Sequence, residues 1–422
     1  MRFDPESTAP LGSHGAQQIE FLASPDGKTW NERSVVPISI DRPWLAVEST
    51  PGRRFGRVYC VGNTDGLIFL RSDDGAASFA PPLDPIGHKI LNCRVANPVV
   101  TSHGTLLLVY EDRIIKTRRP GTRYRPQMHA LRSRDGGESF EEVGPVNTNW
   151  RHDTITSSRS VHTYFPQLAA DPGSEKFSGR AYCVWGDGNS DLSERIFFSS
   201  SSDEGTTWTD PIVISEQPME AGSENEFMTF IPSIAVNRAG VVAVSWYDRR
   251  GLQAGQHVPI AGLQSVFRTN APGWNVRIRA SIDGGHTWLP SVQINEAPGQ
   301  GETDLGHAAG LTASPDGRFH AAWIDNRAGH AQLWTAPVTV MNAPVRAAGA
   351  PGATTQHPRS RSHAPRGNAL PSRSAATWPK MGTNNDDESR NGNARFRYIS
   401  PQIAANRRSG HALLTRSGEG YV

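Results

Sequence analysis

The chain has 422 residues, of which 36% are hydrophobic and 20% are charged, and its formal net charge is +2. That charge is uneven, because the last 82 residues contain 12 Lys and Arg against 4 Asp and Glu, which leaves 31 basic and 37 acidic residues in the first 340. A mildly acidic body argues against a general nucleic-acid-binding surface, and three cysteines are too few for a disulfide framework.

The N-terminus, residues 1–6, has no apolar segment of the signal-peptide type. We therefore leave the localisation open: either the protein stays inside the cell, or the chain begins late. No run of 18 apolar residues occurs, so we expect no membrane span. The sequence also lacks Cys/His zinc spacing, a phosphate loop and a Gly-x-Ser-x-Gly elbow, so we expect neither a metal nor another cofactor.

A pattern that reads Ser-x-Asp-x-Gly-x-Thr/Ser-Trp/Phe occurs five times, each time after an apolar strand-like run. The copies lie at residues 24–30 (one residue shorter than the rest), 72–79, 133–140, 201–208 and 281–288. Each copy predicts a β-hairpin turn in which Asp accepts backbone N–H groups and Gly supplies a positive φ. In the last copy we expect Trp288 to pack back over the turn. The aspartates are thus expected to be structural.

A second hairpin, rich in β-branched and aromatic residues, precedes four of the five turns. Two hairpins make a four-stranded unit, and radial repetition of such units predicts an all-β propeller. Residues 41–80, 97–143, 164–214 and 229–294 form full blades, whereas 19–38 and 306–340 form partial ones. We favour six blades with an incomplete first blade, and five if the two ends share one blade. Cys60 and Cys183 fall at matching strand positions and should be buried.

The composition changes after Val340 and becomes rich in Ala, Pro, Ser, Arg and Asn without periodicity. We therefore divide the chain into a propeller, residues 1–340, and a disordered tail, residues 341–422. A chain ending at Val340 should then melt like the whole protein. Within the tail, the run Phe396–Ile399 is the single strand candidate. The basic excess of the tail indicates a solvated segment better than a nucleic-acid site, since Trp378 alone offers a stacking face.

In a four-stranded up-and-down blade, both hairpin turns lie on one face of the propeller and the longer connections lie on the other. On that second face, binding residues concentrate. Strand ends there share an acidic signature, which reads Tyr110–Arg113, Trp185–Asp187, Trp246–Arg250 and Trp323–Arg327. Two interpretations stay open: Asp ends the strand and Arg pairs with an Asp of a neighbouring blade, or the arginines, Arg113 among them, hold a carboxylate ligand.

The five turns resemble the Asp-box (BNR) repeat of the sialidase-like β-propellers, and the resemblance covers roughly residues 19–340. It implies six blades, structural box aspartates, and three arginines that bind the carboxylate of a sugar. The arginines that match are Arg42, Arg249 and Arg327. The family's Arg-Ile-Pro motif of the first blade is absent here, and Arg42-Pro43 is a displaced counterpart in the second blade.

The same resemblance implies a Tyr–Glu pair as nucleophile and an Asp as acid/base, an exception among glycosidases. The residues available for these roles are Tyr164, Glu226 and Asp153. The family's tyrosine comes late in the propeller, whereas no tyrosine lies between Tyr247 and Tyr398 here. Each of the three candidates also has an ordinary structural interpretation, in a core for Tyr164 and in solvated loops for the two acids.

Two functions therefore compete. One is a sialidase-like glycoside hydrolase that acts on terminal acidic sugars. The other is a non-catalytic propeller that serves as a glycan- or protein-binding module or an assembly factor. The fold by itself does not choose between them. For both, the expected ligand is a small molecule or glycan with negative charge, and the oligomeric state stays open.

Overall fold

The structure is a computed structural model of the chain. It describes residues 18–63, 66–87, 94–112, 127–147, 166–188, 194–216, 229–248, 273–299, 309–325, 327, 332–341, 404–405 and 412–416. These residues form strands and no helix, and they assemble into six sheets. We call the sheets blades 1 to 6 in chain order, and the strands of a blade a to d from the inside outward.

Blades 2 and 3 come from the first third of the chain, and blade 1 combines strands from its two ends. Blade 1 contains β1 (Ile19–Ser24) and β2 (Asn31–Val36), together with β22 (Ala404–Ala405) and β23 (Ala412–Arg416). Blade 2 contains β3 (Asp41–Val47), β4 (Val58–Asn63) and β5 (Leu67–Ser72). Blade 3 contains β6 (Arg94–Val95), β7 (Val99–Val100), β8 (Leu106–Asp112), β9 (Gln127–Ser133) and β10 (Glu141–Pro145).

The other three blades follow the same antiparallel order. Blade 4 contains β11 (Gln167–Ala170), β12 (Ala181–Gly188), β13 (Glu194–Ser201) and β14 (Ile212–Val213). Blade 5 contains β15 (Thr229–Val236), β16 (Val242–Asp248), β17 (Asn275–Ser281) and β18 (Val292–Gln293). Blade 6 contains β19 (Ala309–Ala313), β20 (Phe319–Asp325) and β21 (Gln332–Val338).

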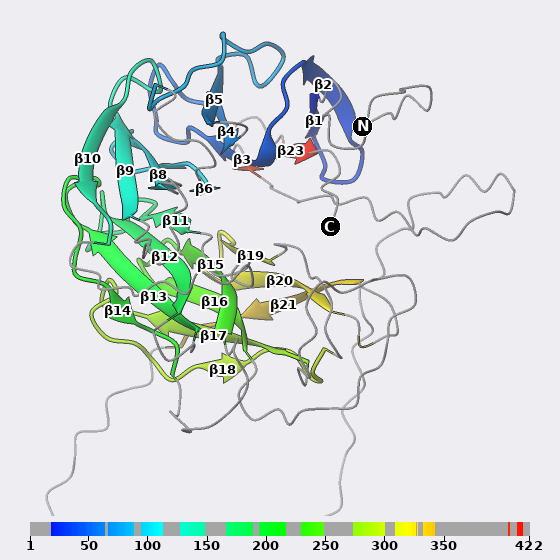
Figure 1. The fold of residues 1–422 in the computed structure, drawn as a ribbon. Coiled ribbons are helices and arrows are strands. Elements are labelled where there is room, and N and C mark those ends of the chain that lie inside the picture. The colour runs from blue at the N-terminus through cyan, green and yellow to red at the C-terminus, as the bar shows by residue number, and fades with distance from the viewer. Residues whose placement is uncertain are drawn as a thin grey trace, which may run out of the picture. The chain divides into compact units, whose positions relative to one another are not determined.

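The blades follow one another around a common centre, as Figure 1 shows, so the predicted β-propeller is confirmed. Each apolar cluster is shared by two consecutive sheets: Leu107 of blade 3 packs with Trp185 and Phe197 of blade 4. Because both faces of a sheet are covered, the middle strands are buried along their length, as in β16, whereas the outer strand β18 is exposed. Cys60 and Cys183 are buried in middle strands, as expected.

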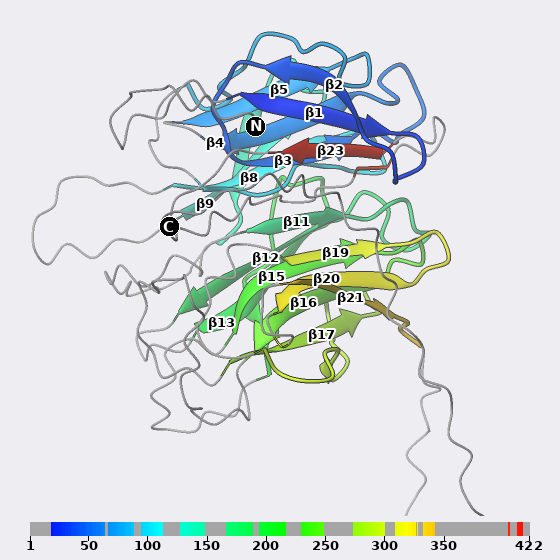
Figure 2. The same cartoon turned by 90° about the vertical axis from the view of Figure 1, so that its right-hand side faces the viewer.

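Blade 1 is assembled from both ends of the chain. Strand β23 pairs antiparallel with β1 over five residues, from Glu20 opposite Arg416 to Ser24 opposite Ala412, and Figure 2 shows the two strands side by side. The expected incomplete first blade is therefore wrong, because β22 and β23 supply its inner hairpin. The segment expected as a single tail, residues 341–422, falls into two parts. Residues 395–422 group with residues 1–340, and residues 341–394 form a second unit. The strand candidate Phe396–Ile399 lies outside the described residues.

The five repeated turns, which we call boxes, have one hydrogen-bond pattern between strands c and d. In the box of blade 5, the Ser281 hydroxyl donates to Asp283 Oδ1 at 2.8 Å and accepts the N–H of Gly285 at 2.8 Å. Asp283 Oδ1 also accepts the N–H of Thr287 at 2.8 Å, and Oδ2 accepts the Thr287 hydroxyl. Trp288 folds back and donates from its indole to the Gly285 carbonyl at 3.2 Å. The aspartates thus organise the turns, as predicted.

A glycine in three of the boxes lies against an apolar side chain of the preceding blade. A Cβ added to Gly285, whose φ is +94°, would lie 2.4 Å from Cζ of Phe198 in blade 4. The corresponding distances are 2.8 Å from Gly205 to a Leu107 methyl and 2.6 Å from Gly137 to Phe69. Glycine is therefore required here both by the backbone conformation and by the close approach of two blades.

The a–b turns meet the boxes of the next blade. Arg57 of blade 2 donates to the carbonyl of Gly136, in the box of blade 3, at 2.8 Å. In the next pair of blades, His103 Nδ1 lies 2.8 Å from Glu204 Oε1 of the following box. Both kinds of short turn consequently share one face, which we call the box face, and this agrees with the topological prediction.

Substitution of Gly285 by Ala should destabilise the protein more than the same change at Gly27. Both glycines have positive φ, so each alanine costs roughly 1–2 kcal/mol of backbone strain. Nothing lies within 4 Å of the Cβ position at Gly27, whereas Phe198 blocks it at Gly285, and overpacking adds roughly 1–3 kcal/mol. Urea unfolding of the two variants measures the difference, and equal losses would contradict the close approach.

Removal of every residue after Val340 should lower the melting temperature. The truncation deletes β23 and leaves the inner edge of β1 unpaired along five residues, at a net cost of about 0.5–1.5 kcal/mol for each hydrogen bond lost. This outcome is the opposite of the one expected from composition. Thermal unfolding followed by circular dichroism tests it, and a melting temperature equal to that of the whole chain would show that β23 contributes nothing.

Stability should fall as the pH drops from about 4 towards 2, because the box carboxylates have lowered pKa values. Backbone hydrogen bonds from Thr29 and Lys28 lower the pKa of Asp26 to about 2. Burial alone would raise the pKa of Asp74, but hydrogen bonds from Ser78 and Ser72 outweigh it and lower the pKa to about 2. A pKa lower in the folded state gives stability above the unfolded value, and protonation removes it. Urea unfolding between pH 5 and pH 2 measures the loss, which should be smaller in Asp74→Asn.

Candidate functional site

The face opposite the boxes is where strands b end and strands a begin. Strands β8, β12, β16 and β20 run from the box face to this second face, which we call the open face. The segments that follow them along the chain, 113–126, 189–193, 249–272 and 328–331, lie outside the described residues. The described part of this face therefore consists mainly of the ends of the strands.

Two of the seven predicted site residues are described, and both lie at the open face. Arg42 is the second residue of β3, which is strand a of blade 2. Arg327 lies two residues after the end of β20, which is strand b of blade 6. The other five lie outside the described residues, so their roles stay predictions. These five are Arg113, Asp153, Tyr164, Glu226 and Arg249.

Arg327 is held in one orientation by its neighbours. Its Nε donates to Asp325 Oδ2 at 2.7 Å, Nη2 donates to the same oxygen, and its backbone N–H donates to Oδ1 at 2.8 Å. The guanidinium carbon lies 4.5 Å from the centroid of the Trp334 ring. The partner is thus the Asp two residues earlier in the same blade and not an Asp of a neighbouring blade. Nη1 makes no hydrogen bond within the described residues.

The Trp-x-Asp signature is used in two ways in consecutive blades. In blade 5 the indole of Trp246 donates to Asp248 Oδ2 at 3.0 Å, so the aspartate satisfies the tryptophan. In blade 6 the equivalent Asp325, fully buried, turns to Arg327 instead. The buried Nε1 of Trp323 then has no hydrogen-bond partner among the described residues. A buried N–H without a partner costs about 1–3 kcal/mol, so the geometry of Arg327 is obtained at the expense of a local hydrogen bond.

Arg42 lies in a strained part of strand a. Its φ is +53°, and the register of β3 against β4 shifts between Asp41 and Trp44. Blade 5 has the same irregularity, where Ile231 has a φ of +49° and likewise precedes a proline. Positive φ is unfavourable for both residue types, and bulges of this kind re-aim side chains near functional sites. At the position where blade 5 has buried Ile231, blade 2 thus has a half-buried cation.

Sequence reasoning missed two buried charged residues at the open face. Arg94 and Glu111 are Cα partners of β6 and β8 in blade 3, and they are 7% and 2% exposed. Glu111 stands one residue before Asp112, the aspartate of the signature. The sequence interpretation considered only the aspartate. No sequence motif surrounds Arg94. It lies beside Glu111 because β6 pairs with β8, and that pairing is not visible in the local sequence.

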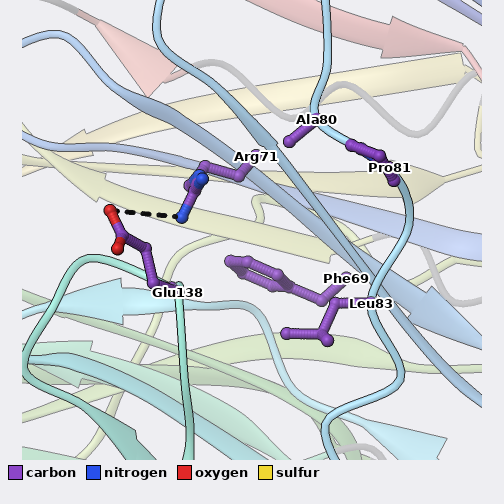
Figure 3. A pocket seen from close by; sticks show the side chains of 7 residues that line it. Phe69, Arg71, Ala80, Pro81, Leu83 and Glu138 are labelled. Carbon is purple, nitrogen blue, oxygen red and sulfur yellow. Dashed lines mark ion pairs between the residues drawn. The ribbon is translucent and has the colours of Figure 1, made fainter.

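The described part of the structure also contains a cavity away from the open face. It lies between strand c of blade 2 and the box of blade 3, where Arg71 faces Glu138 (Figure 3). None of the predicted site residues lines it. We regard the open face as the candidate site of the main function, because both predicted residues that are described lie there.

Two kinds of feature are missing from the described residues. No group of three or more His, Cys, Asp or Glu side chains there is arranged to hold a metal ion. Among the same residues, no helix has the length and apolar character needed to cross a membrane.

Comparison with known proteins gives structural likeness without sequence relatives. No family model matches the chain, and no curated protein sequence matches it. An α-L-arabinanase of Penicillium chrysogenum complexed with arabinobiose is 12% identical, with a TM-score of 0.44 over 74% of this chain and 82% of that one. A protein of unknown function from Dyadobacter fermentans is 15% identical, with a TM-score of 0.42 over 68% and 76%.

A GH93 α-L-arabinofuranosidase of Fusarium graminearum, in complex with arabinobiose, is 11% identical, with a TM-score of 0.41 over 70% of this chain and 80% of that one. At such identities and TM-scores, the likeness assigns no substrate and no residue role to this chain.

Proposed function

We propose that the protein is a glycoside hydrolase of the sialidase type that acts on terminal acidic sugars at the open face. The orientation of Arg327 is the observation that carries the proposal. Asp325 and Trp334 hold the guanidinium in place, and Nη1 is left for a ligand. A guanidinium whose geometry is already set loses little conformational freedom on binding a carboxylate.

Arg42 supports the same assignment. The resemblance of the boxes to the Asp-box repeat implies arginines around a sugar carboxylate, and Arg42 and Arg327 are the two candidates within the described residues. Both lie at the open face, and Arg42 lies there in a strained bulge. Strain of this kind persists where the surrounding structure imposes it, which is frequent at ligand sites.

The chemistry follows from the remaining candidates. The phenol of Tyr164 attacks the anomeric carbon while Glu226 takes its proton, and Asp153 protonates the departing glycosidic oxygen. Water then releases the sugar from the tyrosine, with Asp153 acting as the base. Arg42, Arg249 and Arg327 bind the sugar carboxylate, and Arg113 extends the positive rim.

A non-catalytic role is the second candidate, and a specific observation favours it. The guanidinium of Arg327 already carries one carboxylate partner, Asp325, which offsets its charge. The sequence also lacks the Arg-Ile-Pro motif and the late tyrosine of the family it resembles. In this case the open face binds an acidic glycan without cleaving it.

Replacement of Arg327 by Ala should weaken the binding of N-acetylneuraminic acid roughly 10- to 150-fold, since a charge-assisted hydrogen bond contributes about 1.5–3 kcal/mol. Arg318→Ala is the matched control. Arg318 also pairs with an Asp two residues earlier, Asp316, at 2.6 Å, but it lies at the box face of the same blade. Isothermal titration calorimetry measures both variants, and equal losses would place the sugar elsewhere.

Release of 4-methylumbelliferone from its sialoside then separates the two candidate functions. Turnover by the parent protein that is lost in Glu226→Gln, with binding retained, supports the hydrolase, because the amide keeps the shape but not the basicity. Binding without turnover supports the non-catalytic module. Failure of the parent protein to bind the sugar would reject both.

A further inference from the structure

Arg71 and Arg132 occupy the same place in blades 2 and 3. Each stands on strand c directly before the serine that opens a box. In each blade, the residue nine positions later lies beside the arginine at the outer edge of the sheet. In blade 3 this neighbour is Glu141, the Cα partner of Arg132. In blade 2 it is Ala80, whose N–H donates to the Arg71 carbonyl at 2.9 Å.

Arg132 has partners for its guanidinium on two sides. Its Nε donates to Glu141 Oε1 at 2.7 Å, and its Nη1 donates to the hydroxyl of Thr206, in the box of blade 4, at 2.5 Å. Its side chain is only 8% exposed. A guanidinium in this position is therefore complemented by one carboxylate from its own blade and one hydroxyl from the next blade.

Arg71 has neither of these hydrogen-bond partners, and among the described residues its guanidinium forms only an ion pair, with Glu138. Ala80 stands where Glu141 stands in blade 3, and Glu138 stands where Thr206 stands in blade 4. The Nε of Arg71 is buried and has no hydrogen-bond partner among the described residues. Glu138 Oε1 lies 3.7 Å from Nη1, too far for a hydrogen bond, and its side chain is 60% exposed. The position that Glu141 fills for Arg132 is thus empty for Arg71.

A cavity of about 300 Å³ opens at that position. Figure 3 shows the Arg71 guanidinium on one side of it, and Phe69, Leu83 and Pro81 along the other. We call it the Arg71 groove. Its volume is at the lower end of the range for small-molecule sites. It combines an apolar wall with one cation, Arg71, and one carboxylate, Glu138, so it suits a ligand with an apolar body and no more than one negative charge.

We propose that the Arg71 groove binds a small organic monocarboxylate with an apolar body. The carboxylate pairs with the guanidinium of Arg71, as Glu141 pairs with Arg132, and the body lies against Phe69 and Leu83. The neighbouring carboxylate of Glu138 repels anions of higher charge, which disfavours phosphate and dicarboxylates. This site is independent of the open face, so the outcome there does not affect it.

The probe is 3-phenylpropionate, titrated into the whole chain and followed by saturation-transfer NMR. We expect saturable binding at millimolar concentration and at least tenfold weaker binding of the neutral 3-phenylpropionamide. Inorganic phosphate should not compete. Absence of saturation up to about 10 mM, or equal binding of the amide, would overturn the proposal.

Ala80→Glu supplies the missing carboxylate from the chain itself. It should reduce 3-phenylpropionate binding at least tenfold and raise the melting temperature, because Arg71 then gains the partner that Arg132 has. Ala77→Glu is the matched control: it adds the same group at an exposed box position outside the groove and should leave binding unchanged.

Arg71→Gln keeps the test decisive if Ala80→Glu folds poorly. This variant removes the cation without adding a group to the groove, and it should also lose at least tenfold in affinity at a similar melting temperature. Binding that survives both Arg71→Gln and Ala80→Glu would show that the carboxylate lies elsewhere.

Discussion

The fold depends on the contact between each box and the blade before it. A box is a turn held by its own serine and aspartate, so its backbone can present a glycine to the neighbouring sheet without any side chain between them. The approach of Gly285 to Phe198 is so close that a single methyl group would clash. The same contact at Gly205 and Gly137 sets the spacing of consecutive sheets, and the apolar clusters between blades fill the space that this spacing leaves.

The boxes and the a–b turns join consecutive blades, and we propose that ligands bind at the opposite face. There the strands end in a common Trp-x-Asp signature whose aspartate has two alternative partners. Where it serves the tryptophan, as in Asp248, it completes the fold. Where it turns to an arginine, as in Asp325, it orients a cation at the expense of a buried indole N–H. A local hydrogen-bond choice of this kind lets similar blades carry different chemistry.

The same reasoning applies at the outer edge of the ring, where Arg71 and Arg132 are counterparts. Repetition supplies an arginine in both blades, but its partners come from two different strands and vary independently. In blade 2, Ala80 stands in place of a glutamate and Glu138 in place of a threonine, so Arg71 Nε has no hydrogen-bond partner among the described residues, and a groove lies beside it.

The sequence by itself determined the propeller, the positions of its hairpins and the structural role of the box aspartates, because the hydrogen bonds of a box span at most four residues. Tertiary structure decided the rest. The pairing of β23 with β1 joins residues almost 400 positions apart, and no alternation of apolar and polar residues near residue 412 predicts it. The sequence offered Arg42 and Arg327 as candidates, but it did not predict the backbone strain at Arg42 or the orientation of Arg327. The surroundings of Arg94, Glu111 and Arg71 depend on groups that only strand pairing and the neighbouring blade bring together, and contacts of that kind leave no local pattern in a chain.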